Sequence, residues 1–116
     1  MIICDDDPSI LELLELVAMS AGCEPVIVSK SLDVMKAIRL NTPSLVILDL
    51  WMPVMSGDMI LQTIRKDAEF GDLPVVIVSA SRDGQLIAEQ NGATEYLAKP
   101  FDIIDLTGIL ERYCCR

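Results

Sequence analysis

The stretch Leu45-Val46-Ile47-Leu48-Asp49-Leu50-Trp51-Met52-Pro53 decides the fold of this chain. Its four consecutive aliphatic residues, 45–48, predict a strand that is buried on both faces, as in a parallel sheet covered by helices. The strand ends in a carboxylate, Asp49, and Pro53 then begins a turn that continues through Ser56 and Gly57. We therefore expect Asp49 at the carboxyl end of a central strand, where ligands bind in open α/β sheets. The alternative is an aspartate that only ends the strand by accepting hydrogen bonds from the next loop.

Length and composition indicate one globular unit. The chain has 116 residues, of which 52% are hydrophobic and 23% are charged, which is enough for one compact core. No apolar run approaches the roughly 20 residues that span a bilayer, and no basic segment precedes an apolar one as in a secretory signal. These features predict a single domain over residues 1–116, located in the cytoplasm and not bound to a membrane.

The charge and the cysteines exclude several kinds of site. A net charge of −9 makes nucleic acid a poor direct partner, because phosphate binding needs a basic surface, whereas it suits metal cations and basic partners. A zinc site is not expected, because the sequence has no histidine and its four cysteines form no CxxC pair. Cys4 and Cys23 are expected to be small buried hydrophobic residues.

Strands and helices alternate along the sequence. Strands are predicted over residues 1–4, 25–29, 45–48, 75–78 and 95–98. Helices are predicted from Pro8 to Gly22, over 31–40, 58–67 and 83–91, and from Asp102 to about residue 113, with Asp7 and Asp102 as caps. This alternation predicts an α/β fold in which a parallel sheet carries helices on both faces, joined by right-handed crossovers.

Several chemically active residues follow directly after predicted strands. The carboxyl ends of parallel strands lie along one edge, so that edge should collect Asp5, Asp6, Asp49, Ser79 and Lys99. Three carboxylates repel one another, and oxygen ligands without histidine or cysteine select a hard divalent cation such as Mg²⁺. Each residue alone has a simpler explanation, as a helix cap, a turn residue or a solvated charge. Their coincidence at the ends of four strands favours a site.

Four motifs resemble those of the receiver domain of two-component response regulators, from Met1 to about Tyr113. Each motif is weak alone, and together they are specific. They are Cys4-Asp5-Asp6-Asp7-Pro8, the block Leu48-Asp49-Leu50-Trp51-Met52-Pro53 with Ser56-Gly57, Val78-Ser79-Ala80, and Leu97-Ala98-Lys99-Pro100-Phe101. The resemblance implies a doubly wound, flavodoxin-like sheet of five strands in the order 2-1-3-4-5 with five helices.

The resemblance also implies roles for these residues. Asp49 would be the phosphoacceptor, which takes a phosphoryl group from the phosphohistidine of a histidine kinase or phosphotransfer protein. Asp5 and Asp6 would hold Mg²⁺ together with Asp49 and the backbone carbonyl of Trp51. Lys99 would bind the phosphoryl oxygens once they arrive.

The implied switch consists of Ser79, which would also bind the phosphoryl group, and Tyr96, three residues before Lys99. The fourth helix, the fifth strand and the last helix would form the face that binds a partner or a second copy in a homodimer. Such a protein is a regulator rather than an enzyme, and catalyses only its own phosphorylation and dephosphorylation. Two residues depart from the common pattern: Ser79 replaces the usual threonine but keeps the hydroxyl, and Trp51 is bulky beside the phosphoryl site.

Three other functions fit the pattern less well. An aspartyl-phosphate hydrolase of the haloacid dehalogenase type needs a second aspartate two residues after the nucleophile, where this chain has Trp51. A nucleotide or flavin site needs a glycine-rich loop after the first strand, where this chain has the acidic residues 5–7. A receiver that acts only as an unphosphorylated interaction module would not need the five site residues that are present here.

Overall fold

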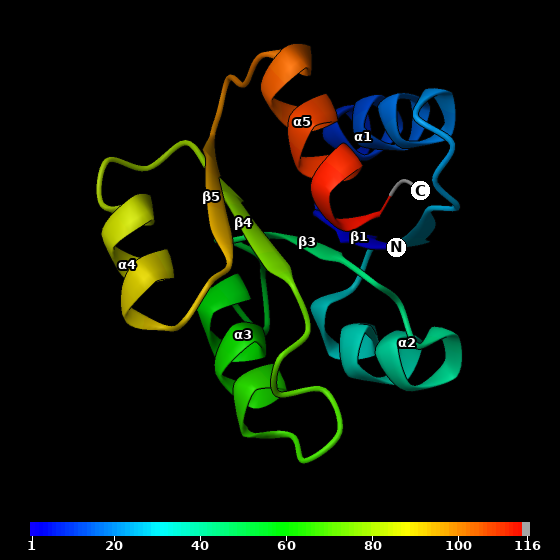
Figure 1. Cartoon of the computed structure of the whole chain (residues 1–116). Helices are drawn as coiled ribbons and strands as arrows, with labels where there is room; N and C mark the ends of the chain where they lie inside the picture. The colour runs from blue at the N-terminus through cyan, green and yellow to red at the C-terminus, as the bar shows by residue number, and fades with distance from the viewer. Residues whose placement is uncertain (115–116) are drawn as a thin grey trace.

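The computed structural model describes residues 1–114 and places five parallel strands in one sheet, in the order β2-β1-β3-β4-β5 (Figure 1). This order confirms the doubly wound topology expected from the sequence. β3 lies at the centre of the sheet and pairs with β1 on one side and β4 on the other. The elements are β1 (Ile2–Cys4), α1 (Pro8–Ser20), β2 (Val26–Val28), the 3-10 turn η1 (Ser31–Asp33), α2 (Val34–Asn41), β3 (Val46–Asp49), α3 (Gly57–Lys66), β4 (Val75–Ser79), α4 (Gly84–Gln90), β5 (Glu95–Ala98) and α5 (Ile103–Tyr113).

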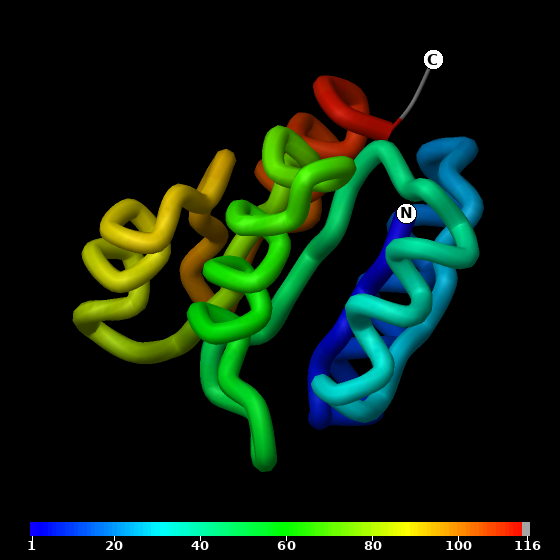
Figure 2. The backbone as a smooth tube through the Cα atoms, turned by 90° about the horizontal axis from the view of Figure 1, so that it is seen from below, coloured from blue at the N-terminus to red at the C-terminus, as the bar shows by residue number. Residues whose placement is uncertain are grey.

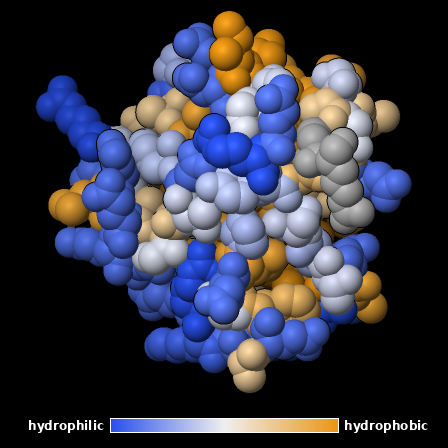
Figure 3. Space-filling view, viewed as in Figure 1, coloured by the Kyte–Doolittle hydropathy of each residue, from blue (hydrophilic) through white to orange (hydrophobic). Residues whose placement is uncertain are grey.

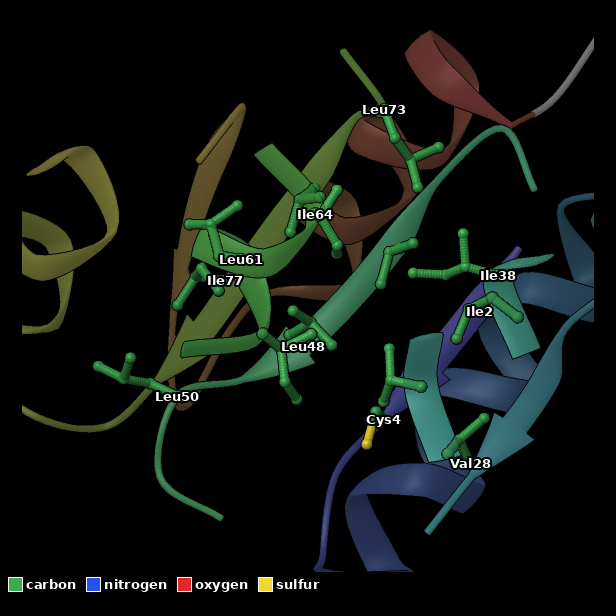
Figure 4. Close-up of a cluster of buried hydrophobic side chains, with 14 of the residues drawn as sticks. Ile2, Cys4, Val28, Ile38, Leu48, Leu50, Leu61, Ile64, Leu73 and Ile77 are labelled. Carbon is green, nitrogen blue, oxygen red and sulfur yellow. The ribbon is translucent and has the colours of Figure 1, made fainter. Parts of the chain in front are cut away.

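Two hydrophobic cores lie on opposite faces of the sheet. Successive residues of a strand point to opposite faces, so Val46 and Leu48 of β3 contact the core under α2, α3 and α4, and Ile47 contacts the core under α1 and α5. Figure 2 shows α2, α3 and α4 side by side in front of the sheet, with α1 and α5 behind it. Figure 4 shows Ile2 and Leu48 pointing from the sheet toward Ile38, Leu61 and Ile64 of the first group of helices. Burial on both faces explains why the central strands are continuously aliphatic.

The first helix begins as its sequence predicts. The Asp7 carboxylate accepts a hydrogen bond of 2.9 Å from the backbone N–H of Ser9, and Pro8 occupies the first helical position. Asp102 also lies at an N-cap position, but its side chain makes no capping hydrogen bond, so that part of the expectation is wrong. None of the helices in residues 1–114 is both long and apolar enough to cross a bilayer.

The helix expected over residues 31–40 begins later than its pattern suggests. Residues 31–33 form η1, in which the Asp33 N–H donates to the Lys30 carbonyl, and the α-helix starts only at Val34. The hydroxyl of Ser31 is held by the loop that follows β3, through bonds to Pro53 and Met55, which fixes the direction in which the chain leaves β2. A contact between residues more than twenty positions apart is invisible to a local helical pattern.

Gly57 allows α3 to pack directly against the end of β3. A Cβ atom at this position would collide with the Asp49 carbonyl oxygen, so the backbone itself would have to shift to make room. The Gly57 N–H donates a 2.8 Å hydrogen bond to the Leu50 carbonyl and closes the base of the loop between β3 and α3. The glycine therefore brings the first turn of α3 close to Asp49.

We predict that Gly57→Ala lowers the free energy of unfolding by about 1–3 kcal/mol, because the added methyl group must displace backbone in a packed region. Denaturant unfolding measures this difference. Gly108→Ala is the matched control, since a Cβ in the middle of α5 would meet only the Arg112 guanidinium, at 3.6 Å. Alanine is the better helix former, so this control should raise stability by about 0.5–1 kcal/mol. Equal effects of the two substitutions would contradict the steric explanation.

Candidate functional site

The ends of β1 and β3 bring the predicted acidic residues together. Cys4 is paired with Leu48 across the two strands, so Asp5 and Asp49 emerge side by side, each one residue beyond that pair. One carboxylate oxygen from each of Asp5, Asp6 and Asp49 lies within 4.8 Å of the other two. Asp5 and Asp49 are buried, whereas Asp6 is exposed to solvent. The structure thus confirms that the three carboxylates form one cluster at the edge of the sheet.

Lys99 crosses the edge of the sheet to reach this cluster. Its Nζ lies 2.9 Å from Asp5 Oδ2 and 3.2 Å from Asp49 Oδ1, so one ammonium group pairs with two buried carboxylates. Its backbone N–H donates a 2.8 Å bond to the Ser79 carbonyl, which anchors the residue at the end of β5. The lysine side chain is only 18% exposed, so water screens these ion pairs weakly.

The charges in the cluster shift two pKa values. Burial, together with the negative charge of Asp5, raises the pKa of Asp49 to about 6, although the Lys99 ammonium opposes the increase. Burial alone would lower the pKa of Lys99, but its hydrogen bonds and charge interactions with Asp5 and Asp49 outweigh burial, and its pKa is raised. At neutral pH, Asp49 is therefore mostly ionised and Lys99 is a cation.

The donor atoms in the cluster suit a hard cation. Carboxylate oxygens are the ligands that Mg²⁺ prefers, and an exposed ligand such as Asp6 leaves room for the waters that this ion retains. Cys4 lies next to the cluster, but its Sγ is not among the grouped ligand atoms. Burial and the charges of Asp5 and Asp49 raise the pKa of its thiol to about 12. The residues present therefore fit the Mg²⁺ that was expected from the sequence.

Cys4 instead forms part of the apolar wall below the cluster. Its Sγ donates to Met52 Sδ at 3.5 Å, and the same hydrophobic core contains the completely buried Leu50. Figure 4 shows Cys4 and Leu50 at the end of the core toward which the strands run. The structure confirms the expectation that Cys4 is a small buried hydrophobic residue.

Ser79 lies at the end of β4, next to Asp49 on the neighbouring strand, but its hydroxyl group is engaged within its own loop. Its Oγ donates to Ser81 Oγ at 3.1 Å and accepts from the Ser81 N–H at 3.0 Å. The register pairs Asp49 with Val78, so Ser79 is one residue farther along the adjacent strand. In this conformation Ser79 joins the site by position and not by a hydrogen bond to the carboxylates.

Tyr96 lies between β4 and the first turn of α4. Its hydroxyl donates a 3.1 Å hydrogen bond to the Ser79 carbonyl. A Cβ on Gly84 would lie 2.7 Å from this hydroxyl and 3.0 Å from Ser79 Oγ, so glycine is the residue that lets α4 cover the pair. Neither Gly84 nor Ser81 was predicted as part of the site, because nothing in the local sequence shows which residue faces the end of β4.

Trp51 lies at the rim of the cluster, two residues beyond Asp49. Its side chain is 54% exposed, and Val54 in the same loop is 81% exposed. Val54 has a φ of 72°. Among the non-glycine residues that the structure describes, only Thr42 also has a positive φ, of 41°. This backbone conformation could not be predicted from the sequence, because position 54 is a valine and not one of the residues, glycine or asparagine, that commonly adopt it.

Comparisons with known proteins agree with this arrangement. A family model described as the response regulator receiver domain matches residues 1–111. The chain is 31% identical over 103 residues to the DNA-binding response regulator MtrA of Mycolicibacterium smegmatis, and 35% identical over 112 residues to the DNA-binding transcriptional regulator NtrC of Escherichia coli. These matches cover 87% and 95% of this chain. This chain belongs to the response regulator receiver domains.

Solved structures support the same family for this receiver domain. A putative response regulator from Chloroflexus aurantiacus superposes with a TM-score of 0.91 at 27% identity and covers 96% of this chain and 93% of its own. The receiver domain of NtrX from Brucella abortus superposes with a TM-score of 0.87 at 28% identity, covering 96% and 94%. Receiver domains are regulatory parts of two-component systems, which confirms the signalling class inferred from the sequence.

The receiver domain corresponds to only part of its curated relatives. The matched region is 44% of the MtrA sequence and 24% of the NtrC sequence. DNA binding is thus a property of those longer proteins as they are named.

The raised pKa of Asp49 predicts a pH-dependent stability. The unfolded chain releases this proton near the ordinary aspartate pKa of 3.8, and the folded receiver domain releases it at a pKa of about 6. Stability should therefore fall as pH rises through this interval and stay reduced above it. Asp49→Asn cannot ionise and should raise the free energy of unfolding by about 1–3 kcal/mol at neutral pH and by little near pH 4.

Urea unfolding in the presence of EDTA, at several pH values, measures this effect without bound cations. Glu111→Gln is the control, because it removes an exposed carboxylate near the far end of α5. Its free energy of unfolding, relative to the wild type, should not rise comparably with pH. If Asp49→Asn raised the free energy of unfolding equally at both ends of the pH range, the result would contradict the raised pKa of Asp49.

Proposed function

We propose that this chain accepts a phosphoryl group on Asp49 from a histidine kinase or a phosphotransfer protein, and that residues 1–116 act as one receiver domain. The observation that carries the proposal is the bridge from Lys99 to both Asp5 and Asp49 at the edge of the sheet. An ionised carboxylate held beside a fixed cation, with two further carboxylates within reach of a metal ion, is the arrangement that phosphoryl transfer to an aspartate needs.

The reaction is a single displacement at phosphorus. An oxygen of the Asp49 carboxylate attacks the phosphorus atom, an O–P bond forms, and the P–N bond to the donor imidazole breaks with its electron pair leaving on nitrogen. The donor ring carries a proton on its other nitrogen, so it leaves as neutral imidazole, and the second product is an acyl phosphate on Asp49. Because the pKa of Asp49 is about 6, most of the carboxylate is already ionised at neutral pH and no base is required.

Lys99 has two roles in this proposal. It now neutralises part of the charge on Asp49, and it can transfer this hydrogen bond to a phosphoryl oxygen because Asp5 holds its ammonium from the other side at 2.9 Å. Mg²⁺, bound by Asp5, Asp6, Asp49 and the Trp51 carbonyl, would supply additional positive charge for the phosphoryl oxygens. Trp51, which is half exposed beside Asp49, would influence the access of water and so the lifetime of the acyl phosphate.

Exposed apolar residues on α1 and at the start of α5 support a donor protein with an apolar contact surface. Leu13, Leu16 and Met19 are 36%, 60% and 60% exposed on α1, and Ile103 and Ile104 are 54% and 83% exposed at the start of α5. The two helices lie side by side, and Figure 3 shows apolar atoms gathered over the start of α5. Exposed apolar groups of this extent are typical of interaction surfaces. We propose that the phosphodonor docks here.

We propose a second binding face, formed by α4, β5 and α5, through which the receiver domain transmits its signal. A groove of about 600 Å³ on this face is lined by Tyr96, Phe101, Ile104, Ile109 and Arg112, among others. Bidentate contacts from Arg112 to Glu95 at 2.7 and 3.1 Å join α5 to β5. A partner or a second copy of the chain would bind this face, which Tyr96 links to Ser79 by a hydrogen bond.

Phosphorylation itself is the direct test. The purified chain, incubated with Mg²⁺ and acetyl phosphate, should gain the mass of one phosphoryl group, and hydroxylamine should remove it because an acyl phosphate is labile to this nucleophile. Asp49→Asn should gain none, and EDTA should prevent the gain in the wild type. Intact mass spectrometry measures both results.

Asp7→Asn is the matched control, because Asp7 belongs to the same acidic run but caps α1. It should accept the phosphoryl group like the wild type. Phosphate uptake by Asp49→Asn equal to that of the wild type would place the modified residue elsewhere. A wild type that binds Mg²⁺ but takes up no phosphoryl group from either acetyl phosphate or a phosphohistidine donor would instead favour an unphosphorylated interaction module.

The switch predicts a change that reaches beyond the cluster. A phosphoryl group adds about −1.5 to −2 charge, and a charge-assisted hydrogen bond from Ser79 is worth about 1.5–3 kcal/mol, enough to change a conformational equilibrium about tenfold or more. Ser79 would have to leave its bonds with Ser81, so the loop from Ala80 to Asp83 should move and the surroundings of Tyr96 should change.

NMR chemical shifts with and without beryllofluoride and Mg²⁺ measure this response, because beryllofluoride imitates the phosphoryl group. Shifts should change at residues 80–106 as well as around Asp49. The variant Ser79→Ala should keep the changes near Asp49 and lose most of those at residues 80–106. Changes confined to the surroundings of Asp49 in the wild type would rule out this route of signalling.

A further inference from the structure

The loop between β3 and α3 is closed at its base and has an unusual backbone at its tip. At the tip, the Met55 N–H donates a 2.9 Å hydrogen bond to the Pro53 carbonyl, and Val54 between them has φ 72°. A hydrogen bond between residues two apart, around a residue with this φ, is a γ-turn of the rare and strained kind. Valine is among the residues least suited to it, because its Cβ carries two branches.

Packing of the valine side chain does not hold this turn in place. Val54 is 81% exposed, so burial of its side chain contributes little to keeping the strained backbone. Strained residues persist only where the surrounding structure fixes them. The contacts that fix Val54 must therefore be made by the backbone on either side of it.

Ser31 supplies those contacts from a different part of the sheet. Its Oγ donates to the Pro53 carbonyl at 3.0 Å and accepts from the Met55 N–H at 3.2 Å, so one hydroxyl group binds both ends of the γ-turn. Ser31 is the first residue of η1, shortly after β2 ends at Val28, and only 6% of the residue is exposed. The partners of this hydroxyl lie 22 and 24 positions later in the sequence. Because it is nearly buried and both donates and accepts, it forms a specific contact between two loops.

The loop that Ser31 holds also borders the acidic cluster. It carries Trp51, and Met52 Sδ accepts a hydrogen bond from Cys4 Sγ, immediately before Asp5. The loop is therefore held at three places. The Gly57 N–H bonds to the Leu50 carbonyl at its base, Cys4 contacts Met52 in its middle, and Ser31 binds its tip. Of these three contacts, the one at the tip depends on a single side chain that makes no contact with the cluster.

We propose that Ser31 is a positioning residue for phosphoryl transfer: its hydroxyl fixes the γ-turn at Val54 and so holds the Trp51 backbone where a cation bound by Asp5, Asp6 and Asp49 can use it. The inference rests on the proposed function and adds a residue that takes no part in the chemistry. Loss of the hydroxyl leaves the carboxylates and Lys99 in place, but lets the loop move relative to them. Mg²⁺ binding should weaken, whereas the chemical step with Mg²⁺ bound should change little.

The experiment compares Ser31→Ala with three other variants and the wild type. Ser31→Thr keeps the hydroxyl. Ser20→Ala is the matched control, because Ser20 Oγ also donates to a backbone carbonyl, at 2.9 Å, but at the end of α1. Asp6→Ala removes one carboxylate from the cluster itself. Two measurements are made for each: the rise in melting temperature with Mg²⁺ concentration, which gives an apparent affinity, and the rate of phosphorylation by acetyl phosphate at increasing Mg²⁺. The fluorescence of Trp51, the only tryptophan in the sequence, reports the position of the loop.

We expect Ser31→Ala to bind Mg²⁺ about two- to tenfold more weakly, the effect of losing one or two hydrogen bonds, and to approach the wild-type rate at saturating Mg²⁺. Its Trp51 emission should differ from that of the wild type before Mg²⁺ is added. Ser31→Thr should restore most of the affinity, and Ser20→Ala should behave like the wild type. A Ser31→Ala variant with unchanged Mg²⁺ affinity, or one whose rate stays low at saturating Mg²⁺, would overturn the proposal.

The phosphoacceptor function and the role of Ser31 are tested by different results. A wild type that responds to Mg²⁺ but accepts no phosphoryl group contradicts the proposed function, while its melting curves still decide the role of Ser31. A wild type and an Asp6→Ala variant that respond identically to Mg²⁺ would show that the cation site is elsewhere, and that result overturns the role of Ser31 as well.

Discussion

The ion pairs of Lys99 with Asp5 and Asp49 are the interaction on which the rest of the structure depends. Two buried carboxylates in contact would repel each other and favour the protonated state. A single ammonium group, 2.9 and 3.2 Å away, makes it possible to keep Asp49 largely ionised at neutral pH with Asp5 beside it. To reach both, Lys99 must leave β5 at the same edge at which β1 and β3 end, which requires all three strands to be parallel.

The surroundings of the cluster make these charges effective. Leu50 and Cys4 are buried in the hydrophobic core below it, and the raised pKa of Cys4 keeps its thiol neutral. Low local polarity strengthens each charge interaction and also makes an unpaired charge costly. The site is therefore sensitive to charge, because an added cation relieves repulsion while an added phosphoryl group increases it. This sensitivity is what a regulatory domain needs in order to respond to a single modification.

At the same edge of the sheet, two loops that are held by different contacts follow β3 and β4. The loop after β3 is held at Leu50, Met52 and the γ-turn that Ser31 binds. The loop after β4 is held by bonds between Ser79 and Ser81, and leads into α4, a helix of 7 residues. The first loop is thus fixed by contacts to three other parts of the chain, whereas the bonds of Ser79 and Ser81 lie within the second loop. The Tyr96 hydroxyl joins β5 to the start of the second loop through its hydrogen bond to the Ser79 carbonyl.

The sequence by itself determined the fold class, the family and the main residues of the cluster. The continuous aliphatic run before Asp49 required a strand buried on both faces, and the position of Asp5, Asp49 and Lys99 after such strands placed them on one edge. These are local patterns with a single geometric consequence. The tertiary structure alone decided which atoms meet: that Lys99 bridges two aspartates, that the Ser79 hydroxyl turns to Ser81, and that Ser31 interrupts the expected helix in order to hold the loop at Val54. Such contacts join residues that are far apart in the chain, and each depends on the summed packing of both faces of the sheet, so no window of neighbouring residues contains the information that fixes them.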